Sequence, residues 1–135
     1  MKIELTDKQF RRLLDMVYIG NWVLNSTRGD DRIADYDDVE SALFAQAPAA
    51  GMGVVTAFEG GVAVPSEKFE NGGIYEAIAD YEDTVFFEIL AEELARRDMA
   101  FEPISPENMR ELSNRIDEYI EEFEQNGMDH IVLEK

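Results

Sequence analysis

The 135-residue chain contains no cysteine, and His130 is its only histidine. Without cysteine it can form no disulfide, no thiolate nucleophile and no thiolate metal site. This is typical of proteins kept in a reducing compartment, so we expect a cytoplasmic location. The opening residues MKIELTDKQFRR favour the same location, because they are charged where a secretory signal would be apolar.

The familiar catalytic patterns are missing as well. A hydrolytic triad needs a histidine beside a nucleophile, and no serine lies in a Gly-x-Ser-x-Gly elbow. Carboxylate-bridged metal sites of helical bundles need Glu-x-x-His pairs, and the chain has none. Gly51 and Gly53 lack the third glycine of a dinucleotide-binding fingerprint. We therefore expect no catalytic, cofactor-binding or metal-binding residues and favour a non-enzymatic role.

Basic side chains are scarce, and the resulting charge is uneven. The formal net charge is −18; residues 1–70 contribute −5 and residues 71–135 contribute −13. Such a field repels nucleic-acid phosphates and anionic membrane surfaces, so we expect no direct binding to either. It favours a basic protein partner. Solubility alone is the competing explanation.

The apolar residues are concentrated first in residues 6–25, TDKQFRRLLDMVYIGNWVLN. From Leu13 to Leu24 they occur on every face of the expected helix, which is typical of a helix buried among others. Asp15 and Asn21 interrupt the run, which is too short to span a membrane. We predict that this helix is the centre of the core and that Gly20 lets another helix approach closely.

The remaining pattern predicts a mainly α fold in a single globular domain, residues 1–135. Further helices are expected at 36–47, 74–99 and 106–125, the last capped by Ser105. Four to five helices would pack around the first one. Residues 1–5 and 130–134 are expected to be short strands that pair and join the two ends of the chain. Residues 49–73 form either a hairpin or a short helix over 49–58, and we favour the helix.

Two groups of residues are candidate sites. Polar and aromatic side chains near one another on the first helix could form a core network that fixes packing, which we favour, or a pocket that binds a small ligand or serves an enzyme. They are Asp15, Tyr18, Asn21, Trp22 and Asn25. The last two helices carry glutamates that could form an acidic interaction face, in one version a mimic of nucleic acid that occupies a basic cleft. They are Glu88, Glu92, Glu111, Glu118, Glu121 and Glu122.

Self-association is a further alternative. Apolar residues left outside the core would provide its contacts, with Phe58, Phe69 and Phe101 as candidates.

Two stretches, LLDMVYIGNWVLN and FFEILAEELARRDM, give the chain a resemblance to a known group of proteins. The combination resembles small, acidic, helical bacterial proteins to which no activity has been assigned. The resemblance implies a bacterial helical protein and brings no ligand or catalytic residue with it.

Overall fold

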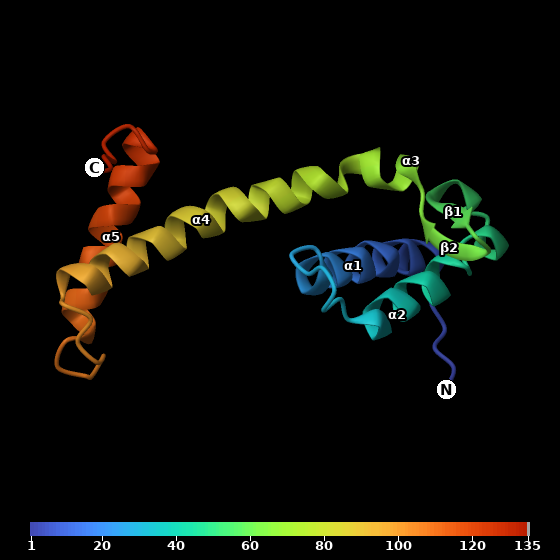
Figure 1. The fold of residues 1–135 in the computed structure, drawn as a ribbon, viewed down its shortest axis with the longest axis horizontal. Helices are drawn as coiled ribbons and strands as arrows, with labels where there is room; N and C mark the ends of the chain where they lie inside the picture. The colour runs from blue at the N-terminus through green and yellow to red at the C-terminus, as the bar shows by residue number, and fades with distance from the viewer. Residues whose placement is uncertain (135) are drawn as a thin grey trace. The chain divides into compact units, whose positions relative to one another are not determined.

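The computed structural model describes residues 1–134, and it is mainly helical with one small antiparallel sheet, as predicted (Figure 1). Its residue contacts divide the chain into Met1–Ile78, the N-terminal unit, and Ala79–Lys135, the C-terminal unit. The single domain expected from the sequence stays a prediction. Within residues 1–134, no helix is long and apolar enough to cross a membrane.

The N-terminal unit begins with two helices, α1 (Asp7–Asn25) and α2 (Ala34–Phe44). Thr6 caps α1 in a reciprocal arrangement: its hydroxyl accepts from the Gln9 backbone N–H at 3.1 Å, and the Gln9 side chain accepts from the Thr6 N–H at 2.9 Å. This capping box satisfies two donors that a helix start would otherwise leave unpaired. The start of the first helix was therefore correctly read from the sequence.

Residues 48–65 form two short 3-10 turns and a hairpin, so the helix favoured for residues 49–58 is wrong. The turns are η1 (Pro48–Ala50) and η2 (Gly53–Val55), and the strands are β1 (Thr56–Glu59) and β2 (Val62–Pro65). Gly60 and Gly61 connect the strands with φ of 57° and 82°. Two consecutive positive φ values match the twist of a tight hairpin, and glycine adopts them without steric cost.

Within residues 1–134 the hairpin strands β1 and β2 form the only sheet, and the predicted pairing of the two chain ends is wrong. Neither residues 1–5 nor residues 130–134 are in strands. Residues 1–5 alternate apolar and polar residues and residues 131–133 are all apolar, but such short patterns specify a strand only where a partner is available. Pairing across a two-residue turn costs far less loop-closure entropy than joining opposite ends of the chain.

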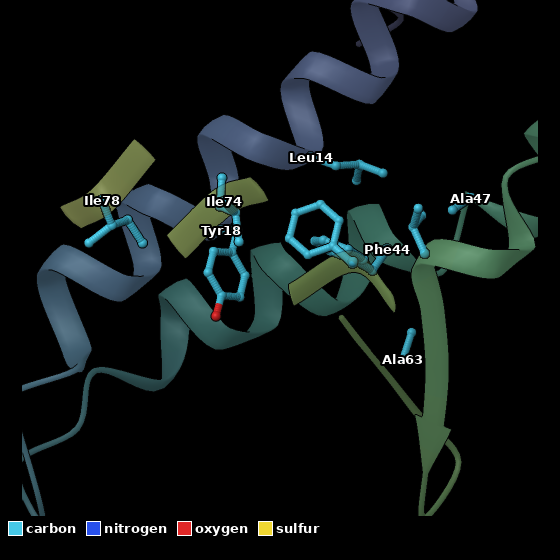
Figure 2. Close-up of a cluster of buried hydrophobic side chains, with 9 residues drawn as sticks. Leu14, Tyr18, Phe44, Ala47, Ala63, Ile74 and Ile78 are labelled. Carbon is cyan, nitrogen blue, oxygen red and sulfur yellow. The ribbon is translucent and has the colours of Figure 1, made fainter. Parts of the chain in front are cut away.

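The core of the N-terminal unit collects side chains from α1, α2, β2 and the segment that follows the hairpin (Figure 2). Phe69 is at its centre: its ring centroid lies 5.3 Å from that of Tyr18 and 5.0 Å from that of Phe44. Phe69 is only 1% exposed, so its proposed role as a surface contact is wrong. Phe58 and Phe101 are exposed, as that hypothesis requires.

Helix α1 is less completely buried than its composition predicts. Leu14 and Tyr18 are in the core, whereas Met16 and Val23 are 69% and 58% exposed, and Ile19 and Trp22 are half-buried. The helix therefore has one buried side rather than an apolar surface covered on all sides. No other helix approaches α1 closely at Gly20, because a Cβ added there would meet no atom within 4 Å. The role predicted for this glycine is therefore wrong.

The hairpin is followed by α3 (Glu67–Phe69), a wide turn η3 (Glu70–Ile74) and the long helix α4 (Tyr75–Asp98). Gly73 has a φ of 107° inside η3, which breaks the helical path just before α4 begins. The prediction of one long helix over residues 74–99 is confirmed. This helix starts in the N-terminal unit and continues into the C-terminal unit.

The C-terminal unit consists of α4 from Ala79 onward and α5 (Met109–Asn126). It has its own core cluster, in which Ala95 of α4 and Met99, just after α4, meet Leu112 of α5. Helix α5 begins three residues later than predicted, with Asn108 and not Ser105 at the N-cap position. The Asn108 side chain instead accepts from the Ser105 N–H at 2.8 Å and donates to the Pro103 carbonyl, which organises the turn before the helix.

Candidate functional site

Four of the five polar and aromatic residues predicted on α1 lie together against α2. Tyr18, Asn21 and Asn25 are buried and Trp22 is half-buried. They line a small cavity of about 170 Å³ whose other walls are Ser26, Arg32 and Glu40. Asp15 is not part of this wall; its carboxylate pairs with the guanidinium groups of Arg11 and Arg12 at 2.6 and 3.0 Å.

Asn25 joins the end of α1 to the segment before α2. Its amide NH₂ donates to Asn21 Oδ1 at 2.7 Å and to the Ile33 carbonyl at 3.0 Å, and its Oδ1 accepts from the Ile33 N–H at 2.8 Å. The Asn21 NH₂ donates to Asp37 and Glu40 on α2, at 2.9 and 3.1 Å. The buried amides are thus satisfied by one another and by α2.

The pKa values of the two carboxyl groups in this network, Asp37 and Glu40, are shifted in opposite directions. Arg32 donates to both Asp37 oxygens, at 2.6 and 2.7 Å, and these bonds lower the pKa of the Asp37 carboxyl, helped by the Asn21 amide. Glu40 is more buried, and burial raises its pKa above the ordinary value, despite the Asn21 hydrogen bond. The negative charge of Asp37 raises it further.

A second polar cluster joins α1 to the start of α4 within the N-terminal unit. The Tyr18 and Tyr75 hydroxyls both donate to Glu70 Oε2, at 3.0 and 2.7 Å. Burial, together with hydrogen bonds to Tyr75 and Glu70, raises the pKa of Tyr18 well above its usual range. The hydroxyl therefore remains protonated at physiological pH and acts as a hydrogen-bond donor.

The six glutamates of the predicted acidic face are all in the C-terminal unit, but they do not gather at one hollow. Glu111 and Glu118 flank Arg115 on α5, and Glu118 and Glu122 line a neighbouring hollow beside Tyr119. Glu88 lines a separate groove between α4 and α5. Glu92 accepts two bonds from Arg96, at 3.0 and 2.8 Å, and Glu121 accepts from Gln125 at 3.3 Å.

Polar contacts between α4 and α5 hold this acidic unit together. The Tyr119 hydroxyl of α5 donates to Asp98 of α4, and Arg97 donates to the same carboxylate at 3.1 and 2.9 Å. The Tyr119 and Arg97 bonds lower the pKa of Asp98, so this carboxyl stays ionised and keeps its two donors.

His130 is exposed, and its Nδ1 lies 2.5 Å from Glu122 Oε1. In the part of the chain that the structure describes, no three acidic or histidine side chains converge where they could hold a metal ion.

The partners of the α1 side chains could not be found from the sequence. Arg32, Asp37 and Glu40 lie on or before α2, and their only sequence signal is a cluster of charges at the expected start of that helix. Which of them faces α1 depends on how the two helices pack. The groove that includes Glu88 was missed for the same reason.

The chain matches no known protein family, no curated protein and no solved structure.

Proposed function

We propose that this protein is a non-enzymatic, acidic protein-interaction module of the bacterial cytoplasm, which binds a basic protein through the surface of its C-terminal unit. One observation carries the proposal: the C-terminal unit contains seventeen acidic and five basic residues, a net charge of −12. A surface of one sign attracts a partner of the opposite sign and accelerates its association.

The pairing within the unit leaves most of this charge uncompensated. Arg96, Arg97 and Arg115 each bond a carboxylate of the same unit, at 2.8 to 3.0 Å. Three of the five basic groups are therefore already engaged, and the remaining carboxylates outnumber all five. Glu88, Glu111, Glu118 and Glu121 are exposed, so a partner can reach them.

The four glutamates of the predicted face on α5 lie on one side of the helix, away from the side that packs against α4, which suits a partner with a concave basic surface. At about 100° per residue, Glu111, Glu118 and Glu122 lie within about 40° of one another around α5, and Glu121 lies about 60–100° from them. A partner with a basic cleft would contact all four. A mimic of nucleic acid that occupies such a cleft is the specific form of the proposal.

Affinity capture with matched variants tests the proposal. We expect a partner captured by the wild-type protein at low salt to be lost when Glu88, Glu92, Glu111, Glu118, Glu121 and Glu122 are all changed to glutamine. A control variant neutralises six exposed carboxylates of the N-terminal unit and should retain the partner: Glu4, Asp30, Asp35, Asp38, Glu59 and Glu67. Equal loss in both variants would contradict a role for the C-terminal unit.

Competition with duplex DNA tests the mimic. If the partner has a nucleic-acid-binding cleft, added duplex should displace it from the wild-type protein. If the partner stays bound at saturating duplex, the mimic is wrong while the acidic interaction surface stands.

A second candidate function is the binding of a small polar ligand in the cavity beside Trp22. It is favoured by the convergence of Trp22 and Glu40 on one small cavity with two buried amides. The amides bond to one another and to α2, which favours a structural network instead. A thermal-shift screen of metabolites distinguishes these roles, because a ligand that prefers the native state raises the melting temperature.

A further inference from the structure

The C-terminal unit contains an apolar groove whose charged rim residues are all acidic. It lies between α4 and α5, has a volume of about 350 Å³, and is lined by residues of this unit alone. Its floor is formed by Phe87, Ile120 and Phe123, and the Phe87 and Phe123 ring centroids are 5.3 Å apart. We call it the α4/α5 groove.

The rim of the α4/α5 groove carries three carboxylates and no basic side chain. Asp83 and Glu88 come from α4 and Glu124 comes from α5, and all three are exposed. Thr84, also exposed, completes the α4 wall; its hydroxyl is used within the helix, donating to the Asp80 carbonyl at 3.0 Å.

We propose that the α4/α5 groove binds a basic protein segment that inserts one large apolar side chain onto the Phe87, Ile120 and Phe123 floor, with lysine or arginine residues beside it contacting the rim. This inference rests on the proposed function and adds the feature that would make the interaction selective. Binding energy in protein interfaces is concentrated in a few anchors that fill pockets, while surrounding charges guide association.

Charge complementarity selects this occupant over a second copy of the chain. Each copy carries −18, and an acidic segment placed in the groove would face three carboxylates of the same sign. Like charges brought together at an interface oppose binding. The half-buried Phe87 and Ile120 leave apolar surface that a basic segment with an aromatic or aliphatic residue would cover.

Three synthetic helical peptides test the inference by NMR titration and calorimetry. The first contains lysine and alanine with one central phenylalanine. The second replaces that phenylalanine with alanine, and the third keeps the phenylalanine but replaces lysine with glutamate. We expect the first to bind about tenfold more tightly than the second, because only the first peptide buries a phenylalanine ring on the groove floor.

Variants of the protein locate the binding. Thr84→Trp places a large ring at the wall of the groove and should abolish the preference for phenylalanine, whereas Thr84→Val should keep it. The double variant Glu88→Lys with Glu124→Lys should bind the first peptide more weakly than the wild-type protein does. The matched control, Glu93→Lys with Asp117→Lys, makes the same change in net charge at exposed sites that do not line the groove and should bind more strongly than the rim variant.

The outcomes separate this inference from the function on which it rests. Equal binding of the two lysine peptides would overturn the apolar anchor and leave the acidic interaction surface intact. Equal binding of the glutamate peptide would overturn the role of the rim. If neither lysine peptide bound at low salt, both the groove and the proposed function would be contradicted. Amide shifts at Phe87, Ile120 and Phe123 are the expected signature of anchored binding.

Discussion

Asn25 is the residue that most directly ties α1 to the chain before α2. It is 1% exposed and makes three hydrogen bonds, two of them to the backbone of Ile33. The net gain in stability from each hydrogen bond of a buried amide is small. The larger effect is that its partners, here the buried backbone groups, are not left without hydrogen bonds. Its main role is therefore to fix the packing of the two helices.

Replacing Asn25 with leucine should lower the free energy of unfolding by about 1–3 kcal/mol, because the Ile33 N–H and carbonyl lose their partners. Denaturant unfolding followed by Trp22 fluorescence measures the change in the N-terminal unit. Asn114→Ala, at an exposed position of α5, is the control and should stay within about 0.5 kcal/mol of the wild type. An Asn25→Leu protein as stable as the control would refute the network.

Glu40 should make the stability of the N-terminal unit depend on pH. Its pKa in the folded protein is raised above the ordinary value of 4.5, mainly by burial. Between pH 4.5, the pKa of the unfolded state, and the higher pKa of the folded state, Glu40 binds more protons in the native protein than in the unfolded chain. The free energy of unfolding therefore falls as pH rises through this window.

We therefore expect Glu40→Gln to be more stable than the wild type at pH 7, with the difference shrinking as pH approaches 4.5. Glutamine retains an oxygen that can accept from Asn21. Asp38→Asn, an exposed change on the same helix, is the control for lost charge. Parallel stability curves for Glu40→Gln and the wild type over this pH range would show that Glu40 is not the cause.

At the scale of single residues, the sequence predicts which residues of one helix lie together better than it predicts their hydrogen-bond partners on another helix. The polar and aromatic residues of α1 were correctly grouped, because helical spacing alone places Tyr18, Trp22 and Asn25 near one another. Asp15 was grouped with them by the same spacing, but Arg11 and Arg12 lie one turn away and bind it first. The bonds from Asn21 to α2 depend on tertiary packing, which no local pattern encodes.

Among the secondary-structure elements, α1 contains a residue that lowers its stability without a packing role. Gly20 lies in the middle of the helix, and a Cβ at this position would meet nothing within 4 Å. Glycine in a helix interior costs about 1 kcal/mol relative to alanine, through lost chain entropy.

Gly20→Ala should accordingly raise the free energy of unfolding by about 0.5–1 kcal/mol. Gly61→Ala should have the opposite effect, because φ at this hairpin position is 82° and alanine is strained there. Thermal or urea unfolding of the two variants measures both changes. Destabilisation by Gly20→Ala would mean that the helix needs glycine at this position.

The long helices were predictable because their apolar spacing extends over many turns, as in α4 and α5. The hairpin was not, because Val54–Phe58 is a short apolar run that fits a strand or a helix equally well. Gly60-Gly61 was the deciding signal, since two adjacent glycines between apolar runs favour a tight turn. The predicted terminal strands failed because a pattern of only five residues carries no information about a partner.

For the whole molecule, charge was the property best predicted from sequence. Net charge is additive, so the acidic character of the last two helices needed no knowledge of their packing. The α4/α5 groove could not be predicted, because its floor combines Phe87 with Ile120 and Phe123 from a helix more than thirty positions later. The separate core clusters of the two units were missed for the same reason.

The most direct test of the central claim is the dissociation constant of the captured partner, measured from about 50 mM to about 500 mM salt, a range that strongly shortens electrostatic reach. We expect the affinity of the wild-type protein to fall by roughly tenfold or more over this range. The six-glutamine variant of the C-terminal unit should bind weakly at every salt concentration. A wild-type affinity that does not change with ionic strength would contradict an acidic interaction surface.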